Sequence, residues 1–123
     1  MKRKILIVED NVGLSQIQKD WLSRAGYDAV TAMSEPIARS LIRRMQFDLI
    51  LSDVRLPEGD GISLLEWLRK EKKDIPFIIT TEYVSVPDVV RTIKLGARDY
   101  LPKPVHRDYL LELAEDVFHP VAT

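Results

Sequence analysis

Short apolar runs recur along the chain and predict the strands of a sheet. The runs lie at residues 5–8, 27–32, 48–52, 77–81 and 99–101, and polar or turn-forming residues bound each of them. The run at 27–32 is less uniformly apolar than the others and suits a strand at the edge of a sheet. The continuous runs suit strands that are covered on both faces.

Between these runs, apolar residues recur three and four positions apart, as they do in helices that bury one face. The helical sets span residues 14–25, 38–45, 64–68, 86–93 and 110–117. Ser34 stands before Glu35-Pro36 as a helix cap would, and Gly26 and Gly96 follow the first and fourth sets, where a left-handed residue ends a helix. We therefore expect five helices, each with one apolar stripe.

The alternation of strand and helix, five times over, predicts the fold class. It indicates an α/β protein with a doubly wound parallel sheet and helices on both faces. In such sheets ligands bind outside the carboxyl ends of the strands. We therefore expect the functional residues to follow the strands directly.

Composition narrows the classes of function. The chain has 123 residues, no cysteine, and 18 Lys/Arg against 19 Asp/Glu, for a net charge of −1. This excludes thiol catalysis and cysteine metal sites, and argues against nucleic-acid binding by charge. The apolar run at 5–8 is too short for a signal peptide or a membrane span, so we expect a soluble cytoplasmic domain. We expect that domain to occupy residues 1–119, with 120–123 as a tail or the start of a linker.

Polar residues gather where the predicted strands end. Glu9 and Asp10 follow the first strand, Asp53 the third, Thr81 ends the fourth, and Lys103 follows the fifth. Each has an ordinary structural explanation, because Asp favours turns, Thr favours strands and Lys is usually solvated. Three carboxylates at one edge, however, repel one another unless a cation lies between them. Mg²⁺ accepts such oxygen ligands together with water and phosphate.

This ordered set resembles the receiver domain of two-component response regulators, over about residues 3–118. The spacings from Asp53 to Thr81 and from Thr81 to Lys103 are similar to those of that family. The resemblance implies a flavodoxin-like (βα)5 fold with strand order 2-1-3-4-5. The matching residues are Glu9-Asp10, Asp53, residues 56–61, Thr81 and Lys103-Pro104.

The resemblance also implies a phosphorylation site with Mg²⁺ as its cofactor. Asp53 is the implied phosphoacceptor, and its carboxylate attacks the phosphorus of a phosphohistidine or a small acyl phosphate. Asp10 and Asp53 are the implied direct metal ligands, together with the backbone carbonyl of Arg55. Glu9 is expected to reach the metal through water. Such a domain transfers the donor's phosphoryl group to its own aspartate and is not a turnover enzyme.

Further residues match the family's switch. Lys103 is implied to contact a phosphoryl oxygen, and Pro104 to follow it through a cis peptide bond. Thr81 is implied to donate its hydroxyl to the phosphoryl group, and Tyr100 matches the aromatic switch position. Thr80 competes for the role of Thr81, but the spacing to Lys103 favours Thr81.

The implied partners are a sensor histidine kinase and an effector domain or downstream protein, with a possible homodimer on phosphorylation. We expect no direct nucleic-acid contact by this domain and no membrane. Residues 99–104 most resemble receivers of NtrC-type transcription regulators, so the implied output is control of transcription. The surface that changes is expected to comprise the fourth helix, the fifth strand and the fifth helix.

One position departs from the family pattern. Glu82 follows the switch hydroxyl, where Ala or Gly is usual, and adds negative charge near an incoming phosphate. We expect Arg55 to pair with Glu82 across the entrance. An alternative is a pseudo-receiver that is not phosphorylated and acts as a scaffold. A nucleotide or hydrolytic enzyme is disfavoured because the sequence has no Gly-rich phosphate loop and no G-x-S-x-G motif.

Overall fold

A parallel sheet of five strands forms the centre of the computed structural model, which describes residues 2–120. The strand order is β2-β1-β3-β6-β7 and every neighbouring pair is parallel. Counted along the chain, these are the first to fifth long strands, so the predicted order 2-1-3-4-5 is confirmed. The strands are β1 (Lys4–Val8), β2 (Asp28–Ala32), β3 (Leu49–Asp53), β6 (Phe77–Thr81) and β7 (Asp99–Pro102).

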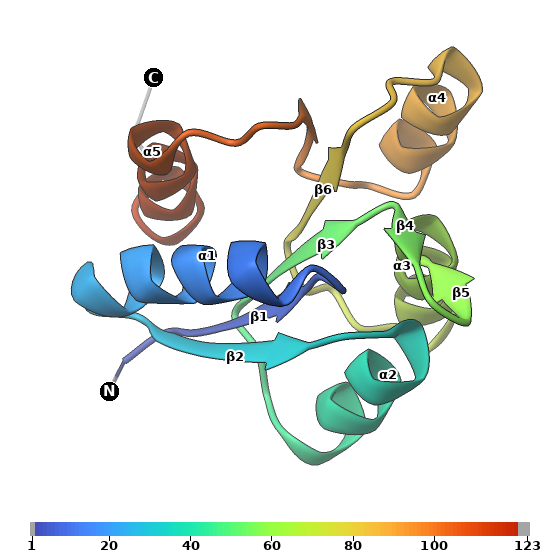
Figure 1. Ribbon diagram of the computed structural model, residues 1–123. Helices are drawn as coiled ribbons and strands as arrows, with labels where there is room; N and C mark the ends of the chain where they lie inside the picture. Colours follow the sequence, from blue (N-terminus) through green and yellow to red (C-terminus); the bar gives the residue numbers. More distant parts are fainter. Residues whose placement is uncertain (1, 121–123) are drawn as a thin grey trace.

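Five helices cover the two faces of this sheet, as predicted (Figure 1). Helices α1 and α5 lie together on one face, whereas α2 and α3 pack on the other and α4 adjoins α3. None of the helices in residues 2–120 combines the length and apolar character that a membrane crossing requires. The helices are α1 (Val12–Arg24), α2 (Glu35–Arg44), α3 (Gly61–Lys70), α4 (Val86–Lys94) and α5 (Arg107–Phe118).

The core consists of two apolar clusters separated by the sheet. In β1, Leu6 and Val8 face the cluster beneath α2 and α3, whereas Ile5 and Ile7 face the cluster beneath α1 and α5. Alternate side chains of a strand point to opposite faces, so a strand covered on both sides must be apolar throughout. This explains the continuous runs, and the mixed run that forms β2 lies at the sheet edge as expected.

The predicted helix ends are confirmed by local geometry. The Ser34 hydroxyl accepts a hydrogen bond from the backbone N–H of Ile37 at 3.4 Å and caps α2. Gly26 and Gly96 follow α1 and α4 with φ of +98° and +78°, the left-handed conformation that glycine adopts without a steric penalty. These boundaries were therefore encoded by residues within a few positions of each helix end.

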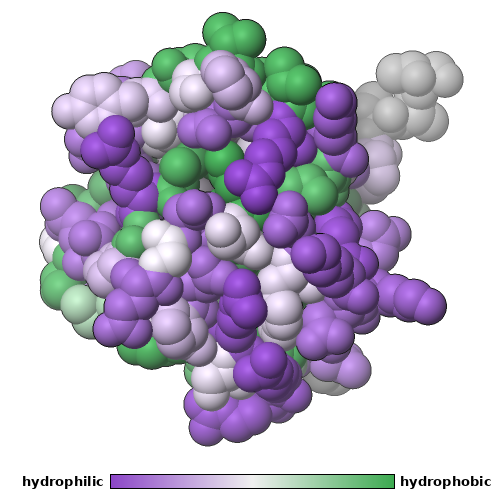
Figure 2. Space-filling model, turned by 90° about the vertical axis from the view of Figure 1, so that its right-hand side faces the viewer, coloured by the Kyte–Doolittle hydropathy of each residue, from purple (hydrophilic) through white to green (hydrophobic). Residues whose placement is uncertain are grey.

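The fourth helix does not bury its apolar stripe as amphipathic helices usually do. Val86 is 73 % exposed, Val90 45 % and Ile93 66 %, and Val89 is half-buried. Figure 2 shows apolar residues gathered at the top of the molecule, over α4. The buried residue of this helix is Thr92, whose hydroxyl donates to the Val89 carbonyl at 2.9 Å. Helical periodicity defines which residues share a face, but it does not define where that face points.

A small antiparallel hairpin follows β3 and was not predicted. It pairs β4 (Arg55–Leu56) with β5 (Gly59–Asp60), and α3 begins immediately after it. The predicted tail at 120–123 lies mostly outside the described residues, which end at 120. The boundary at residue 119 remains a prediction.

Candidate functional site

Three carboxylates meet at the carboxyl edge of the sheet. Glu9 and Asp10 follow β1 and Asp53 ends β3, and these strands are neighbours with Val8 beside Ser52. One oxygen from each of the three carboxylates lies within 4.8 Å of the others. Glu9 and Asp53 are buried and Asp10 is exposed. The sheet topology therefore brings together the acidic residues that the sequence placed at separate strand ends.

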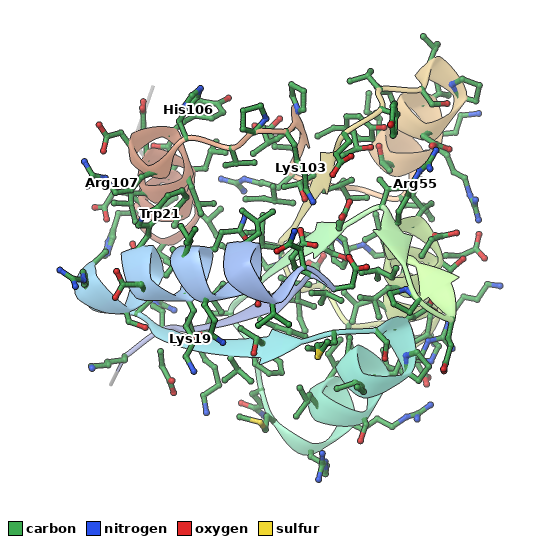
Figure 3. The ribbon with its side chains drawn as sticks, viewed as in Figure 1. Lys19, Trp21, Arg55, Lys103, His106 and Arg107 are labelled. Atoms are coloured by element: carbon green, nitrogen blue, oxygen red, sulfur yellow. The ribbon has the colours of Figure 1, made fainter. Side chains whose placement is uncertain are left out.

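Lys103 points into this acidic cluster, as Figure 3 shows. Its Nζ donates to Oε1 of Glu9 at 2.6 Å and to Oδ2 of Asp53 at 2.8 Å. The backbone N–H of Lys103 donates to the Thr81 carbonyl at 2.7 Å, and the Lys103–Pro104 peptide is cis, as the resemblance implied. One ammonium thus contacts two of the three carboxylates.

Burial and hydrogen bonding shift the pKa values of Glu9 and Lys103. Burial raises the pKa of Glu9, although hydrogen bonds from Lys103 and from the backbone N–H of Asn11 oppose the rise. Burial by itself would lower the pKa of Lys103, but hydrogen bonds to Asp53 and Glu9 outweigh it and leave that pKa raised. The site therefore holds Lys103 as a cation and keeps Glu9 easier to protonate than a solvated glutamate.

The backbone closes tightly around Asp53. The Arg55 N–H lies 3.4 Å from Oδ1 of Asp53, and the Gly61 N–H donates to the Val54 carbonyl at 2.8 Å. A Cβ at Gly61 would overlap the Asp53 carbonyl oxygen and come within 2.8 Å of the Ser52 hydroxyl. Gly61 is thus required by the close approach of this backbone.

Thr81 is buried at the end of β6 but does not contact the carboxylates through its side chain. Its hydroxyl donates to the Tyr83 carbonyl at 3.0 Å and accepts from the Tyr83 N–H at 3.1 Å. Thr80, the competing residue, is also buried and lies beside Asp53 in the strand register.

Tyr100 lies on β7. Its ring packs against the apolar cluster beneath α2 and α3, and it is half-buried. Its hydroxyl is buried and has no hydrogen-bond partner among residues 2–120. No hydrogen bond therefore fixes the orientation of this ring.

The expected pair between Arg55 and Glu82 is not formed. The Arg55 guanidinium lies 4.8 Å from the centre of the Tyr83 ring, and the ion pairs found in the described part of the chain include neither Arg55 nor Glu82. The face of an aromatic ring attracts a cation, and Tyr83 offers that face beside the entrance. Glu82 instead lines a cavity of about 340 Å³ with Leu14, Gln18 and Lys103.

The donor set fits a hard divalent cation. Carboxylate oxygens from three residues lie within 4.8 Å of one another, and Mg²⁺ takes oxygen ligands from one or two carboxylates together with water and phosphate. Asp10 is exposed, so one side of the cluster remains open to water or phosphate. The arrangement suits an ion that bridges carboxylates and a phosphoryl group.

Fold and site together define the class: a flavodoxin-like α/β domain with an acidic pocket, closed by a lysine, at the carboxyl edge of its sheet. The chain belongs to the response regulator receiver domain family, whose model matches residues 5–115. Receiver domains generally bind Mg²⁺ in such an acidic pocket and interact with histidine kinases and effector domains.

Among characterised proteins, the similar ones include NtrC-type regulators. The chain is 35 % identical over 112 residues to the response regulator protein PilR of Pseudomonas aeruginosa, covering 91 % of this chain and 25 % of PilR. It is 40 % identical over 114 residues to the transcriptional regulatory protein ZraR of Salmonella typhimurium, covering 93 % of this chain and 26 % of ZraR. The chain thus spans about a quarter of the length of these relatives.

Solved structures show the same fold over nearly the full chain. A CheY-like response regulator receiver domain protein from Methanospirillum hungatei matches with a TM-score of 0.91 and 31 % identity, covering 96 % of this chain and 95 % of the other. The non-phosphorylated HemR receiver domain of Leptospira biflexa matches with a TM-score of 0.89 and 35 % identity, covering 99 % and 98 % of the two chains. The protein is therefore a phosphorylation-dependent signalling domain by family.

Proposed function

We propose that this domain accepts a phosphoryl group on Asp53 from a sensor histidine kinase. A carboxylate oxygen of Asp53 attacks phosphorus, a new P–O bond forms, and the P–N bond of the phosphohistidine breaks. The imidazole keeps the electron pair of that bond. The observation that supports this role is the contact of Lys103 Nζ with Asp53 at 2.8 Å, because the same ammonium can pair with the transferred phosphoryl group.

The proposed cofactor is Mg²⁺, held by Asp10, Asp53 and the carbonyl of Arg55, with Glu9 acting through water. When bound, the metal neutralises negative charge on the incoming phosphoryl group. Glu9 is engaged by Lys103 and by the Asn11 N–H, which supports an indirect role for it. Asp10 is exposed, which supports a direct one.

The proposed switch couples Asp53 to the surface of α4, β7 and α5. On phosphorylation the Thr81 hydroxyl leaves the Tyr83 backbone and donates to a phosphoryl oxygen. Tyr100, whose hydroxyl has no partner in the described structure, moves inward with it. The exposed stripe of α4 belongs to the surface that changes, and a ligand-dependent shift between two populations of this surface is the output.

The proposed partners follow from the relatives. These are transcriptional regulators about four times as long as the matched region, so we propose an effector that acts on transcription. The proposed location of the protein is the cytoplasm. We propose residues 1–119 as the receiver unit. In this proposal it forms a homodimer on phosphorylation, makes no direct nucleic-acid contact, and is not a turnover enzyme.

The first prediction tests phosphorylation directly. Acetyl phosphate with Mg²⁺ should label the wild-type protein, and Asp53→Asn or removal of Mg²⁺ by EDTA should abolish labelling, because either change removes the acceptor or the counter-charge. Intact-protein mass spectrometry measures the added phosphoryl group. Asp20→Asn, an equivalent substitution at an exposed position of α1, should be labelled like the wild type.

The alternative is a scaffold that is not phosphorylated. Glu82 supports it, since an exposed carboxylate beside the entrance repels an incoming phosphate. A folded wild-type protein that stays unlabelled both by acetyl phosphate with Mg²⁺ and by a phosphorylated histidine kinase would exclude the switch and leave this alternative.

A further inference from the structure

Glu35 is a buried carboxylate that has no part in the proposed phosphorylation chemistry. It is the first residue of α2 and is only 4 % exposed. A glutamate in the first turn of a helix ordinarily faces water and interacts with the helix dipole. Burying a carboxylate is costly unless it is paired and hydrogen-bonded, so its partners indicate what it holds.

The partners of Glu35 come from its own helix and from the hairpin after β3. One oxygen pairs with the guanidinium of Arg39, which lies 5.1 Å from the centre of the Trp67 ring. The other oxygen accepts the backbone N–H of Asp60 at 2.9 Å. Asp60 is distant in sequence, so this bond joins α2 to β5.

The hairpin is shaped to receive this carboxylate. Gly59 has φ of +138°, and a Cβ at that position would overlap Oε1 of Glu35. Glycine is therefore needed both for the backbone conformation and for the close approach. The next residue, Asp60, caps α3 by accepting the Ser63 N–H at 2.6 Å.

The same hairpin also borders the phosphorylation site at Asp53. It begins at Arg55, whose N–H faces Asp53 and whose carbonyl is a proposed metal ligand. It is followed directly by Gly61, whose N–H donates to the Val54 carbonyl and where a Cβ would overlap the Asp53 carbonyl oxygen. The β4–β5 hairpin thus contacts Asp53 through the Arg55 N–H and Glu35 through the Asp60 N–H.

We propose that Glu35 is a positioning residue for the phosphorylation site. It holds the β4–β5 hairpin through the Asp60 N–H, and the hairpin in turn holds the Arg55 carbonyl in place for Mg²⁺. Arg39, held over Trp67, balances the buried charge. The inference rests on the proposed function, since it concerns the metal of the same site.

The test compares Glu35→Ala, Glu35→Asp and Glu35→Gln. The alanine has no acceptor and the aspartate is too short to reach the Asp60 N–H, whereas glutamine keeps a carbonyl at the right distance. The Asp60 amide should therefore exchange with D₂O about tenfold faster in the first two variants. Residues that orient metal ligands typically change metal affinity by about 10–100-fold, and an indirect effect should lie at the lower end. We expect Mg²⁺ to bind about tenfold more weakly to Glu35→Ala and Glu35→Asp, and near wild-type strength to return in Glu35→Gln.

Nuclear magnetic resonance measures the amide exchange, and calorimetric titration with MgCl₂ measures the affinity. Asp20→Ala is the matched control, because Asp20 is also paired with an arginine four residues later but is exposed and far from the hairpin in sequence. Glu35→Asp keeps a favourable first-turn charge, so the test stands if the alanine variant fails to fold.

Unchanged Mg²⁺ affinity in folded Glu35→Asp would overturn the inference, as would a wild-type protein that does not bind Mg²⁺. Both measurements use the unphosphorylated protein. A wild type that binds Mg²⁺ but is never labelled would overturn only the proposed phosphorylation.

Discussion

At the scale of single residues, one lysine offsets part of the charge of the acidic cluster. Lys103 reaches both Glu9 and Asp53, and burial raises the pKa of Glu9 even with that lysine present. Without Lys103, Glu9 would face the charge of Asp53 with only the Asn11 N–H as a donor. Removing one partner of a buried ion pair leaves an uncompensated charge, which favours protonation.

We therefore predict that Lys103→Met raises the pKa of the Glu9 carboxyl further in the metal-free protein. A pH titration followed by ¹³C resonances of the glutamate carboxyls measures it. Lys94→Met, which removes an exposed lysine from α4, should leave the Glu9 titration as in the wild type. A Glu9 pKa that stays the same in Lys103→Met would contradict the prediction.

The same shift has a defined effect on stability. A carboxyl whose pKa is higher in the folded than in the unfolded state favours folding when protonated, so its contribution declines as pH rises through the folded pKa. The stability that Lys103→Met loses relative to the wild type should therefore be greater at about pH 8 than at about pH 5, as urea unfolding at each pH would show. An equal loss at both would contradict this sign.

At the scale of elements, α4 and α5 use their apolar residues differently. Leu110 of α5 is 1 % exposed and belongs to the core, whereas Ile93 of α4 lies on the exposed stripe. Truncating a buried leucine leaves a cavity, but changing an exposed residue removes little burial. Hydrophobic character in the sequence was the same at both positions.

We predict that Leu110→Ala lowers the free energy of unfolding by about 2–5 kcal/mol. Ile93→Ser should change it by no more than about 0.5 kcal/mol, because the side chain is already in water. Equilibrium urea denaturation compares the two variants. A loss from Ile93→Ser as large as that from Leu110→Ala would mean that the stripe of α4 is part of the core.

At the scale of the whole molecule, one sheet joins two cores. Trp67 packs beside the cluster under α2 and α3, and Trp21 beside the cluster under α1 and α5. Each central strand contributes alternate residues to both clusters, so neither cluster can lose its packing while the strands stay folded. The domain should therefore unfold as one cooperative unit.

We predict that Trp21→Phe and Trp67→Phe, each with one remaining tryptophan, show the same denaturation midpoint by fluorescence and by far-ultraviolet circular dichroism within each variant. Each variant serves as the control for the other because the reporter changes sides of the sheet. A fluorescence midpoint well below the circular dichroism midpoint in either variant would indicate that one side opens first.

The sequence by itself determined the order of the five long strands and five helices and the ends marked by Ser34, Gly26 and Gly96, because alternation, helical spacing and caps are local properties. The resemblance to receiver domains also identified the residues at the sheet edge, and the structure brings Glu9, Asp53 and Lys103 together as expected. The roles of these residues in phosphorylation stay predictions.

Only the tertiary structure decided which way each face turns and which partner each charge finds. The stripe of α4 points outward, Arg55 lies over the Tyr83 ring and does not pair with Glu82, and Glu35 is buried against the hairpin. Each of these outcomes depends on segments far apart in the chain. A local pattern cannot report them, because the free energy of a contact is set by what surrounds it after folding.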